Sequence, residues 1–522
     1  MTQKQTLCNA KRQMKNEKTS RTLIQLTLKA WVLIVLIMGI SLSAQGQIFS
    51  TPKNISDDIG ITQHAQIEMD EEGNTYTVWA DGTEGISAIY FSRSIDGGQT
   101  FSDPKNISYQ NSYSAYFPKI AIGDQGYIYL VWVQSYPQDH IWISYSSDYG
   151  ATFSPPKVIA AADGGAEIAV DSQGNVNIVL YDIVYPARYV YFCRSIDNGE
   201  TFSSPIYLSI GTAPKIAVDS DGKIYIVWDY DEIYFTCSSN GETFSDPVNL
   251  SADLYDGNSN PEMVVDSGGN INIVWRNAAY AGNEVYFRRS TDGGATFDTP
   301  VNVSNTPNKQ SASPQIAVDS QGHISVAWWQ GVEGSTKTDI FFSYSTDGTC
   351  FSAPTNISNT LTVSSQRQKI AVDDQGNINI IWDEHDPDSG IFFSRSVDGG
   401  MSFSEPKDLY VGAATPQCTI DNTGDVFAVC WKDDDIHFIR SLDSLFFDLI
   451  DLTNEINLNS LDAKLDVAIR ILEDSNDNND RAGIQALEAF IRQVEAQRDV
   501  QISDEYADTL IGVAQIIVNL LE

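Results

Sequence analysis

Apolar and polar residues alternate along most of this chain in short runs, and turns that contain glycine separate the runs. One pattern, apolar-Val-Asp-x-x-Gly-x-apolar-x-apolar-Val-Trp, recurs at Ile168–Leu180, Ile216–Trp228, Met263–Trp275, Ile316–Trp328 and Ile370–Trp382, and weaker copies end at Trp79, Trp132 and Trp431. Alternation over this length is typical of half-buried β-strands. The Asp-x-x-Gly step suits a tight hairpin, because aspartate caps the turn and glycine takes its left-handed position. The sequence therefore predicts eight hairpins.

A second motif, Ser-x-Asp-x-Gly-x-Thr/Ser-Phe, repeats in step with the first. Intact copies span Ser94–Phe101, Ser146–Phe153, Ser195–Phe202, Ser290–Phe297 and Ser396–Phe403, and altered copies span Cys237–Phe244, Ser345–Phe351 and Ser441–Phe446. In the Cys237 copy we assign Ser239 to the aspartate position. The aspartate can accept backbone N–H bonds across a turn, and the phenylalanine can fill the space beneath it. We expect these aspartates to be structural: Asp96, Asp148, Asp197, Asp292, Asp347 and Asp398.

Each repeat of roughly 50 residues also contains a third strand before the motif and a short fourth strand after it. Four antiparallel strands repeated eight times predict a closed, eight-bladed β-propeller within the all-β class. Residues Phe49–Ser56 copy a fourth strand ahead of any first strand, so they could close the ring. Residues Phe446–Thr453 are the alternative closing segment.

The second motif resembles the Asp box, or bacterial neuraminidase repeat, of sialidase-like β-propellers, and the resemblance covers residues 49–453. Sialidases of that family use three arginines that clamp a carboxylate, a tyrosine activated by a glutamate, and an acid/base aspartate. This chain lacks the family's early Phe/Tyr-Arg-Ile-Pro motif, and it counts eight units where catalytic sialidases have six blades. The resemblance therefore favours a non-catalytic binding propeller for a glycan or protein ligand, with an exo-α-sialidase or another glycoside hydrolase of this superfamily as the alternative.

The arginines fall into two groups. One group occupies a single repeat position just before the motif's serine: Arg93, Arg194, Arg289, Arg395 and Arg440. Arg188, Arg276 and Arg367 lie elsewhere, and a sialidase-type clamp would have to come from them. We assign no catalytic residue.

One face of the predicted disc carries the loops that vary between repeats, and it is our candidate ligand face. The hairpin turns and the Asp-box turns are near-copies and share the opposite face. The candidates on the variable face are Tyr136, Tyr185, Arg188, Arg276, Trp329, Glu333, Arg367, Glu384 and His385.

Both ends of the chain differ from the repeats. Residues 1–46 combine a basic stretch with an apolar run from Ala30 to about Leu42, which is typical of a secretory signal peptide, with a membrane anchor as the alternative. Residues 454–522 show apolar positions at helical spacing, and we expect a small three-helix module, similar to those of secreted bacterial proteins. Residues 47–453 then form the propeller, and the chain is predicted to be secreted or attached to the cell surface.

Charge narrows the range of partners. The chain carries 32 basic and 69 acidic residues, a formal net charge of −37, and seven of the basic residues lie in the leader. Such a surface repels nucleic acid and anionic lipid, so we expect neither nucleic-acid binding nor membrane insertion beyond the leader.

No metal motif appears and no cofactor is predicted; calcium is the alternative, since the Asp474–Asp480 turn partly resembles a calcium loop. Five cysteines follow the leader, and Cys418 and Cys430 could form a disulfide.

Overall fold

The computed structural model describes residues 47–56, 62–82, 86–108, 113–135, 138–252, 254, 257–279, 282–360, 363–385, 389–456, 459–472, 480–498 and 500–522. Residues from Ile48 onwards form one compact unit. The leader, Tyr136 and the turn at 473–479 lie outside the described residues. Among the described residues, no helix is long and apolar enough to cross a membrane.

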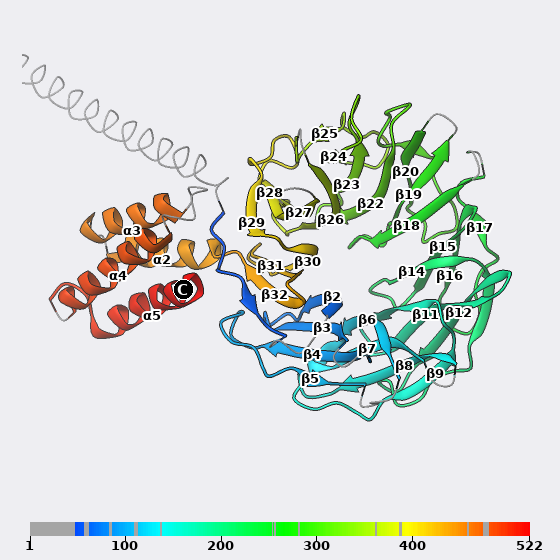
Figure 1. Cartoon of the computed structure of the whole chain (residues 1–522), viewed down its shortest axis with the longest axis horizontal. Coiled ribbons are helices and arrows are strands. Elements are labelled where there is room, and N and C mark those ends of the chain that lie inside the picture. Colours follow the sequence, from blue (N-terminus) through cyan, green and yellow to red (C-terminus); the bar gives the residue numbers. More distant parts are fainter. Residues whose placement is uncertain are drawn as a thin grey trace, which may run out of the picture. The chain divides into compact units, whose positions relative to one another are not determined.

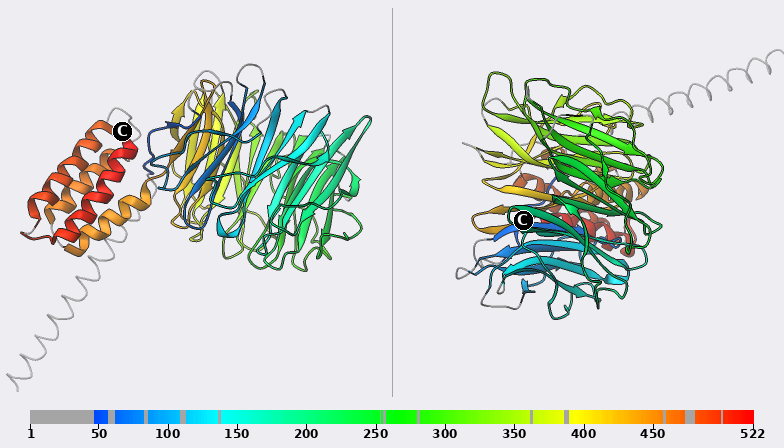
Figure 2. Two further views of the ribbon diagram at one scale, coloured as in Figure 1. Left: turned by 90° about the horizontal axis from the view of Figure 1, so that it is seen from below. Right: turned by 90° about the vertical axis from the view of Figure 1, so that its right-hand side faces the viewer.

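Eight four-stranded antiparallel sheets confirm the predicted eight-bladed propeller (Figure 1). Blade 1 consists of β2 Thr62–Met69, β3 Thr75–Asp81, β4 Ala88–Ser94 and β5 Lys105–Asn106. Blade 2 consists of β6 Ala115–Ile122, β7 Ile128–Ser135, β8 Asp139–Ser146 and β9 Lys157–Ala161. Blade 3 consists of β10 Gly165–Val170, β11 Val176–Val184, β12 Ala187–Ser195 and β13 Ile206–Ile210. Blade 4 consists of β14 Thr212–Val218, β15 Ile224–Tyr230, β16 Glu232–Ser238 and β17 Val248–Asn249. Blade 5 consists of β18 Asn258–Val265, β19 Ile271–Ala279, β20 Gly282–Ser290 and β21 Val301–Asn302. Blade 6 consists of β22 Ser311–Val318, β23 Ile324–Gly331, β24 Thr338–Ser345 and β25 Thr355–Asn356. Blade 7 is β26 Ser364–Val372, β27 Ile378–His385, β28 Gly390–Ser396 and β29 Lys407–Val411. Two further views show the ring of blades from the side (Figure 2).

The eighth blade joins the two ends of the repeat region. It consists of β30 Ala414–Ile420, β31 Val426–Lys432, β32 Asp435–Arg440 and, from the start of the chain, β1 Lys53–Asn54. Lys53 pairs with Phe438, and Asn54 pairs with His437. The segment Phe49–Ser56 therefore closes the ring as predicted. The alternative segment, Phe446–Thr453, is helical instead.

Blades pack through buried side chains on both faces of each sheet. Six tryptophans of the hairpin pattern are fully buried, whereas Trp431 is half-buried, and the core clusters join one blade to the next. The motif's phenylalanine lies between blades: Phe153 of blade 2 meets Phe91 of blade 1 edge to face at 4.8 Å. Phe101 of blade 1 approaches Phe438 of blade 8 at 4.8 Å, so the same contact occurs where the ring closes.

The motif turns have the hydrogen bonds that their residues predict. In blade 1, Asp96 accepts bonds from the Thr100 backbone N–H at 2.9 Å and the Thr100 hydroxyl at 2.6 Å. The Ser94 hydroxyl donates to Asp96 and accepts from the Gly98 N–H, both at 2.8 Å. Gly98 has φ +88, a left-handed conformation that glycine adopts without strain.

The altered copy in blade 4 differs from our alignment. Its serine is Ser238, which accepts the Gly241 N–H at 2.9 Å, and Asn240 takes the aspartate's place by accepting the Thr243 N–H at 3.0 Å. The assignment of Ser239 to that position was wrong. The copy is one residue short, and an amide oxygen accepts the same bond as a carboxylate.

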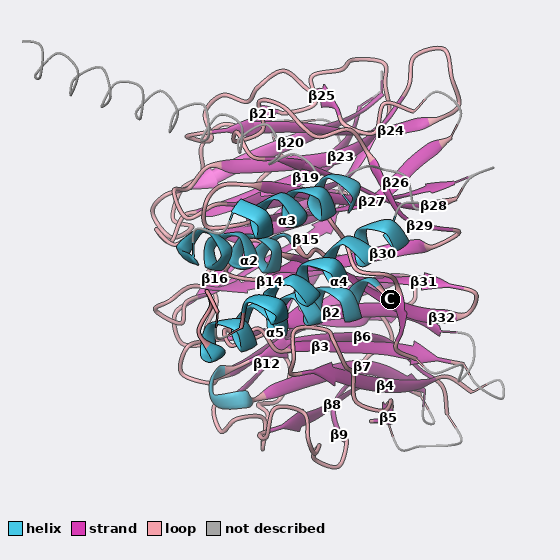
Figure 3. Cartoon of the chain, turned by 90° about the vertical axis from the view of Figure 1, so that its left-hand side faces the viewer, coloured by secondary structure: helices cyan, strands magenta, loops and turns pink. Residues whose placement is uncertain are grey.

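The C-terminal part contains four described helices where the sequence indicated three (Figure 3). They are α2 Asp443–Ile456, α3 Asn459–Leu472, α4 Asp480–Gln497 and α5 Asp504–Leu521. The additional helix, α2, begins within the eroded last motif copy, directly after β32. The predicted apolar stripes form the helical core, with Leu465, Phe490 and Leu510 buried. Ser503 caps α5 by accepting the Tyr506 N–H.

All five described cysteines are free thiols, so the Cys418–Cys430 disulfide is not formed. Cys418 lies opposite Ala428 in the sheet, which leaves the two sulfur atoms out of register.

Candidate functional site

The innermost strand of each blade carries an irregularity near its start. In seven blades the pairing of the first two strands shifts there, which is the mark of a β-bulge. One non-glycine residue per bulge adopts a left-handed conformation: His64, Phe117, Ala213, Asn260, Ser313, Arg367 and Thr415. Blade 3 has Gly165 there, with φ +111. Such conformations cost on the order of 1–3 kcal/mol each and gather at binding sites.

Two positions after the left-handed residue, every blade carries a long polar side chain. These residues form a ring around the axis of the propeller, which we call the polar ring: Gln66, Lys119, Glu167, Lys215, Glu262, Gln315, Lys369 and Gln417. Two adjoining cavities open over it and share Phe117 and Lys119. Both lie at the end of the blades that carries the variable loops.

Blades 2 to 5 hold a continuous chain of ion pairs. Lys119 contacts Glu167 at 3.0 Å, and Lys215 contacts Glu167 at 3.4 Å and Glu262 at 3.2 Å. Burial opposes ionisation of Glu167, but the two lysines outweigh it and lower the pKa of this carboxyl. Glu262 and Glu167 in turn raise the pKa of Lys215. This half of the ring lines a cavity of about 300 Å³, here called the ion-pair cavity.

The other half of the ring is built from three glutamines and one lysine, Lys369. A cavity of about 370 Å³, here called the glutamine cavity, contains no aspartate or glutamate among its lining residues. It is lined by His64, Ala65, Gln66, Phe117, Pro118, Lys119, Ser313, Gln315, Arg367, Gln368, Lys369, Thr415, Pro416 and Gln417. Desolvation lowers the pKa of Lys369, and this lysine makes no ion pair or side-chain hydrogen bond within the described part of the chain.

Phe117 stands between the two cavities. It is 45% exposed although it is a large apolar residue in a left-handed conformation. Its ring meets His64 edge to face at 4.6 Å and Tyr116 at 5.4 Å, so neighbouring rings hold it in place. An exposed, rigidly held aromatic ring is a natural platform for stacking a ligand.

A carboxyl group faces the axis below the ring. Glu68 follows Gln66 by two residues on β2, so both project from the same side of the strand. Its side chain is exposed toward the axis, yet the surrounding walls raise its pKa to about 7 by desolvation. Elsewhere in this lower layer the residues are small and uncharged: Ala121, Ala169, Ala217, Val264, Ala317, Ala371 and Thr419.

Buried acids behind the ring hold the bulges. Asp383 accepts the Thr415 N–H of blade 8 at 3.0 Å and the Arg367 guanidinium at 2.9 Å. Asp229 accepts the Asn260 N–H at 3.1 Å, and desolvation raises the pKa of Asp229 to about 6. Each carboxylate thus ties the bulge of the following blade to its own blade.

The predicted ligand-face residues lie near this end of the blades, but with different surroundings. Tyr185 is 94% exposed in the β11–β12 turn. Trp329 is half-buried, and its Nε1 donates to the Ser313 hydroxyl of the glutamine cavity at 3.2 Å. Glu333 is exposed and lies 3.9 Å from Lys309. Glu384 is buried and accepts the Trp382 Nε1–H, and His385 lies 3.4 Å from Asp383.

The three candidate clamp arginines belong to alternate blades. Arg188 is on blade 3, Arg276 on blade 5 and Arg367 on blade 7. Arg367 is paired with Asp383, and no contact joins any two of the three within the described residues. One tyrosine–glutamate hydrogen bond, from Tyr145 to Glu200, lies at the Asp-box end, far along the blades from these arginines.

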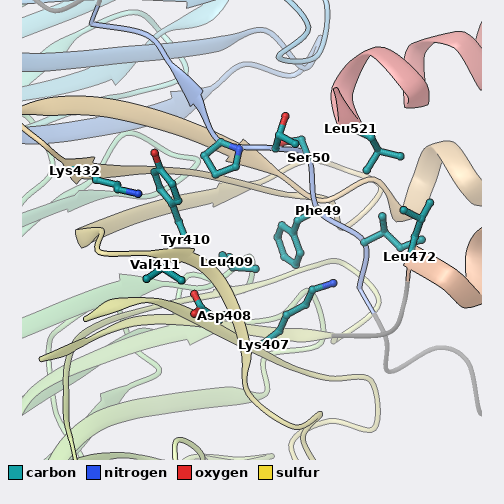
Figure 4. Close-up of a pocket in the computed structure, with 13 residues that line it drawn as sticks. Phe49, Ser50, Lys407, Asp408, Leu409, Tyr410, Val411, Lys432, Leu472 and Leu521 are labelled. Atoms are coloured by element: carbon teal, nitrogen blue, oxygen red, sulfur yellow. The ribbon is translucent and has the colours of Figure 1, made fainter. Parts of the chain in front are cut away.

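A third hollow, of about 310 Å³, lies beside the closing segment (Figure 4). Its walls include Phe49, Tyr410 and Leu521. Lys432 already covers the Tyr410 ring at 3.9 Å, and Lys407 lies over Phe49 at 5.9 Å. Since lysines of the chain occupy both aromatic faces, this hollow is a weaker candidate. The described residues contain no group of three or more histidine, cysteine or acidic side chains that could hold a metal ion.

Sequence reasoning missed the polar ring and Phe117. The signal was present, because the residue just before each apolar start of the hairpin pattern is always glutamine, lysine or glutamate. In five blades a proline precedes it, which cannot donate to the sheet and fits a bulge.

Comparisons with known proteins concern the architecture alone. No family model matches the sequence, and no curated protein does. Among solved structures, a PL25 ulvan lyase bound to -[GlcA(1-4)Rha3S]- aligns with a TM-score of 0.47 at 13% identity, over 76% of this chain and 93% of that one. A protein of unknown function from Dyadobacter fermentans gives 0.39 at 13% over 76% and 97%. The intramolecular trans-sialidase from Ruminococcus gnavus gives 0.33 at 14% over 63% and 92%. At these values the likeness carries no argument about site or ligand.

Proposed function

We propose that this chain is a non-catalytic binding propeller, secreted or held at the cell surface, that binds a glycan over the polar ring. The observation that carries the proposal is the glutamine cavity, which is lined by the ring amides Gln66, Gln315 and Gln417 together with one exposed aromatic ring, Phe117. Amides can donate and accept hydrogen bonds at once, as sugar hydroxyls require, and an aromatic face stacks on the C–H side of a sugar. Binding cavities of about this size, with a few convergent polar groups, are the usual ligand sites of folded proteins.

A protein partner is the competing ligand class within this proposal. The exposed tip at Tyr185 and the variable loops would contact it, outside the cavity. The cavity favours a glycan because it is concave and lies at the axis, where a flat protein surface does not reach. The alternative of an exo-α-sialidase has less support, because Arg188, Arg276 and Arg367 are spread over alternate blades.

The experiment is a glycan array with the purified protein, followed by titration calorimetry on the strongest oligosaccharide. Phe117→Ala should weaken binding on the order of tenfold, because stacking on an aromatic face is lost. Met401→Ala is the matched control, since Met401 is 71% exposed on an Asp-box turn at the other end of blade 7. Absence of any glycan binding, or equal loss from both variants, would contradict the proposal, and release of sialic acid from an aryl sialoside would restore the enzyme alternative.

A further inference from the structure

The polar ring divides into two electrostatically different halves. In only one of them are the positive charges neutralised by carboxylates of the ring itself. In blades 2 to 5 the lysines Lys119 and Lys215 are neutralised by Glu167 and Glu262. In blades 6, 7, 8 and 1 the ring contributes Gln315, Lys369, Gln417 and Gln66. The second half therefore holds one positive charge and no negative charge.

Lys369 differs from the other two lysines of the ring. Lys119 and Lys215 each have a carboxylate within 3.4 Å, whereas Lys369 has no such partner within the described residues. Glu262 of blade 5 acts on the pKa of Lys369 only through its charge, and Gln315 of the intervening blade 6 donates a hydrogen bond to Glu262 at 3.3 Å. A half-buried ammonium group without a counter-charge has lost part of its hydration, and a bound anion would offset that loss.

The arginine and the other lysine that line this cavity are already paired with carboxylates of the chain. Arg367 is bound to the buried carboxylate of Asp383. Lys119, shared between the cavities, is already paired with Glu167. The charge offered to a ligand in the glutamine cavity therefore comes from Lys369.

We infer that the glutamine cavity selects an acidic saccharide, and that Lys369 is the specificity-determining residue that binds its carboxylate or sulfate. The inference rests on the proposed function and names the ligand class for the same site. Glutamines on either side of Lys369 would bind the neighbouring hydroxyls, and Phe117 would stack on the ring of the same or the adjacent sugar. The surrounding chain, with its net charge of −37, repels anions in general, so this local cation gives selectivity that the whole surface does not.

The test is calorimetric titration of the full chain with galacturonate, alginate and chondroitin oligosaccharides, each compared with its carboxyl-reduced form and with a sulfated carrageenan oligosaccharide. The variants are Lys369→Gln, Lys369→Arg and, as control, Lys309→Gln, which removes the same charge from a loop on the same face. Glutamine occupies the equivalent ring position in three other blades, so Lys369→Gln should fold, and an unchanged melting temperature checks this.

We expect at least one acidic oligosaccharide to bind more tightly than its reduced form. Lys369→Gln should weaken that binding about tenfold or more, while Lys369→Arg and Lys309→Gln stay within about threefold of the parent. Binding of the galacturonate oligosaccharide identifies a carboxylate as the group that is recognised, whereas binding of the carrageenan oligosaccharide identifies a sulfate. Equal binding of acidic and carboxyl-reduced forms without binding of the carrageenan oligosaccharide, or acidic binding unaffected by Lys369→Gln, overturns the inference and leaves the proposed function standing. Binding of no glycan at all contradicts both.

Discussion

The guanidinium of Arg440, in the last blade, donates a hydrogen bond to the carbonyl oxygen of Gly97, 343 residues earlier in the first blade. Arg289 occupies the same repeat position in blade 5 and makes an equivalent bond to the next blade, because its guanidinium donates to the Asp347 carbonyl at 3.2 Å. Arg440 also contacts Asp425 at 2.7 Å, and both side chains are buried. Five of the eight motif copies are preceded by such an arginine, which joins one blade to the next, and Arg440 joins the two ends of the ring.

Replacing Arg440 with methionine should therefore destabilise the protein strongly. The change leaves the Asp425 carboxylate buried without its cation, at a cost of about 3–5 kcal/mol. Arg93→Met is the matched control, because Arg93 donates to the Tyr149 carbonyl from a half-buried position and pairs with no carboxylate among the described residues. Denaturant unfolding should show a far smaller loss for Arg93→Met. Equal losses would mean that the buried ion pair adds nothing to closure.

The Asp boxes predict an acid dependence of stability. Hydrogen bonds from Thr201 and Ser195 lower the pKa of Asp197 to about 2. A carboxyl whose pKa is lower in the folded state stabilises that state above its unfolded pKa, near 3.9, and this contribution is lost as pH falls toward 2. Asp197→Asn should therefore lower the melting temperature at pH 7, and the difference from the parent should shrink as pH approaches 2.

Blade 4 supplies a natural reference, since Asn240 already stands at this position and the turn still forms. Asp246→Asn, an exposed acid just after the same turn, controls for loss of one charge. A difference for Asp197→Asn that persists unchanged at pH 2 would contradict the hydrogen-bond account of the turn.

Glu68 predicts a pH dependence of ligand binding near neutrality. Since its pKa is about 7, this carboxyl is mainly ionised at pH 8 and mainly protonated at pH 6. Protonation removes a negative charge from the axis just below the polar ring, so an acidic oligosaccharide should bind a few-fold more tightly at pH 6 than at pH 8. Desolvation and Lys119 lower the pKa of His64, so its protonation adds to the same trend only at still lower pH.

Glu68→Gln should bind more tightly at pH 8 and should lose most of the change between pH 6 and pH 8. Calorimetry in buffers of matched ionic strength measures this, with the carboxyl-reduced oligosaccharide as a ligand control. A neutral ligand with the same pH response would point to a change of structure instead of an electrostatic effect.

Sequence periodicity predicted most of the fold, because the turns and strands of each repeat are encoded by residues within that repeat. The Trp-ended hairpins, the Asp-box turns and the closing segment at Phe49–Ser56 follow from local patterns that reappear in register. The helix α2 could not be predicted in the same way: its residues still carry traces of the last motif copy, and its apolar positions, such as Leu449, pack against other helices. Tertiary packing overrides the local signal there.

The candidate site was predicted only as a face. Variable loops predicted a ligand face at the end of the blades where Trp329, Arg367 and His385 lie, but loop variability does not reveal what the inner strands bring together. The polar ring depends on closure, since Lys119 of blade 2 and Lys369 of blade 7 lie five blades apart along the chain and yet line one cavity. Single residues at one repeat position form a common site only because the repeats close into a ring.

The most direct test of the account is hydroxyl-radical footprinting of the protein with and without its strongest bound oligosaccharide, read residue by residue by mass spectrometry. Oxidisable side chains mark both ends of the blades: Phe117 and His64 at the polar ring, and Met401 at an Asp-box turn. We predict that the oligosaccharide protects Phe117 and His64 and leaves Met401 unchanged. Protection of Met401, with Phe117 and His64 unaffected, would place the ligand on the Asp-box face and contradict the account.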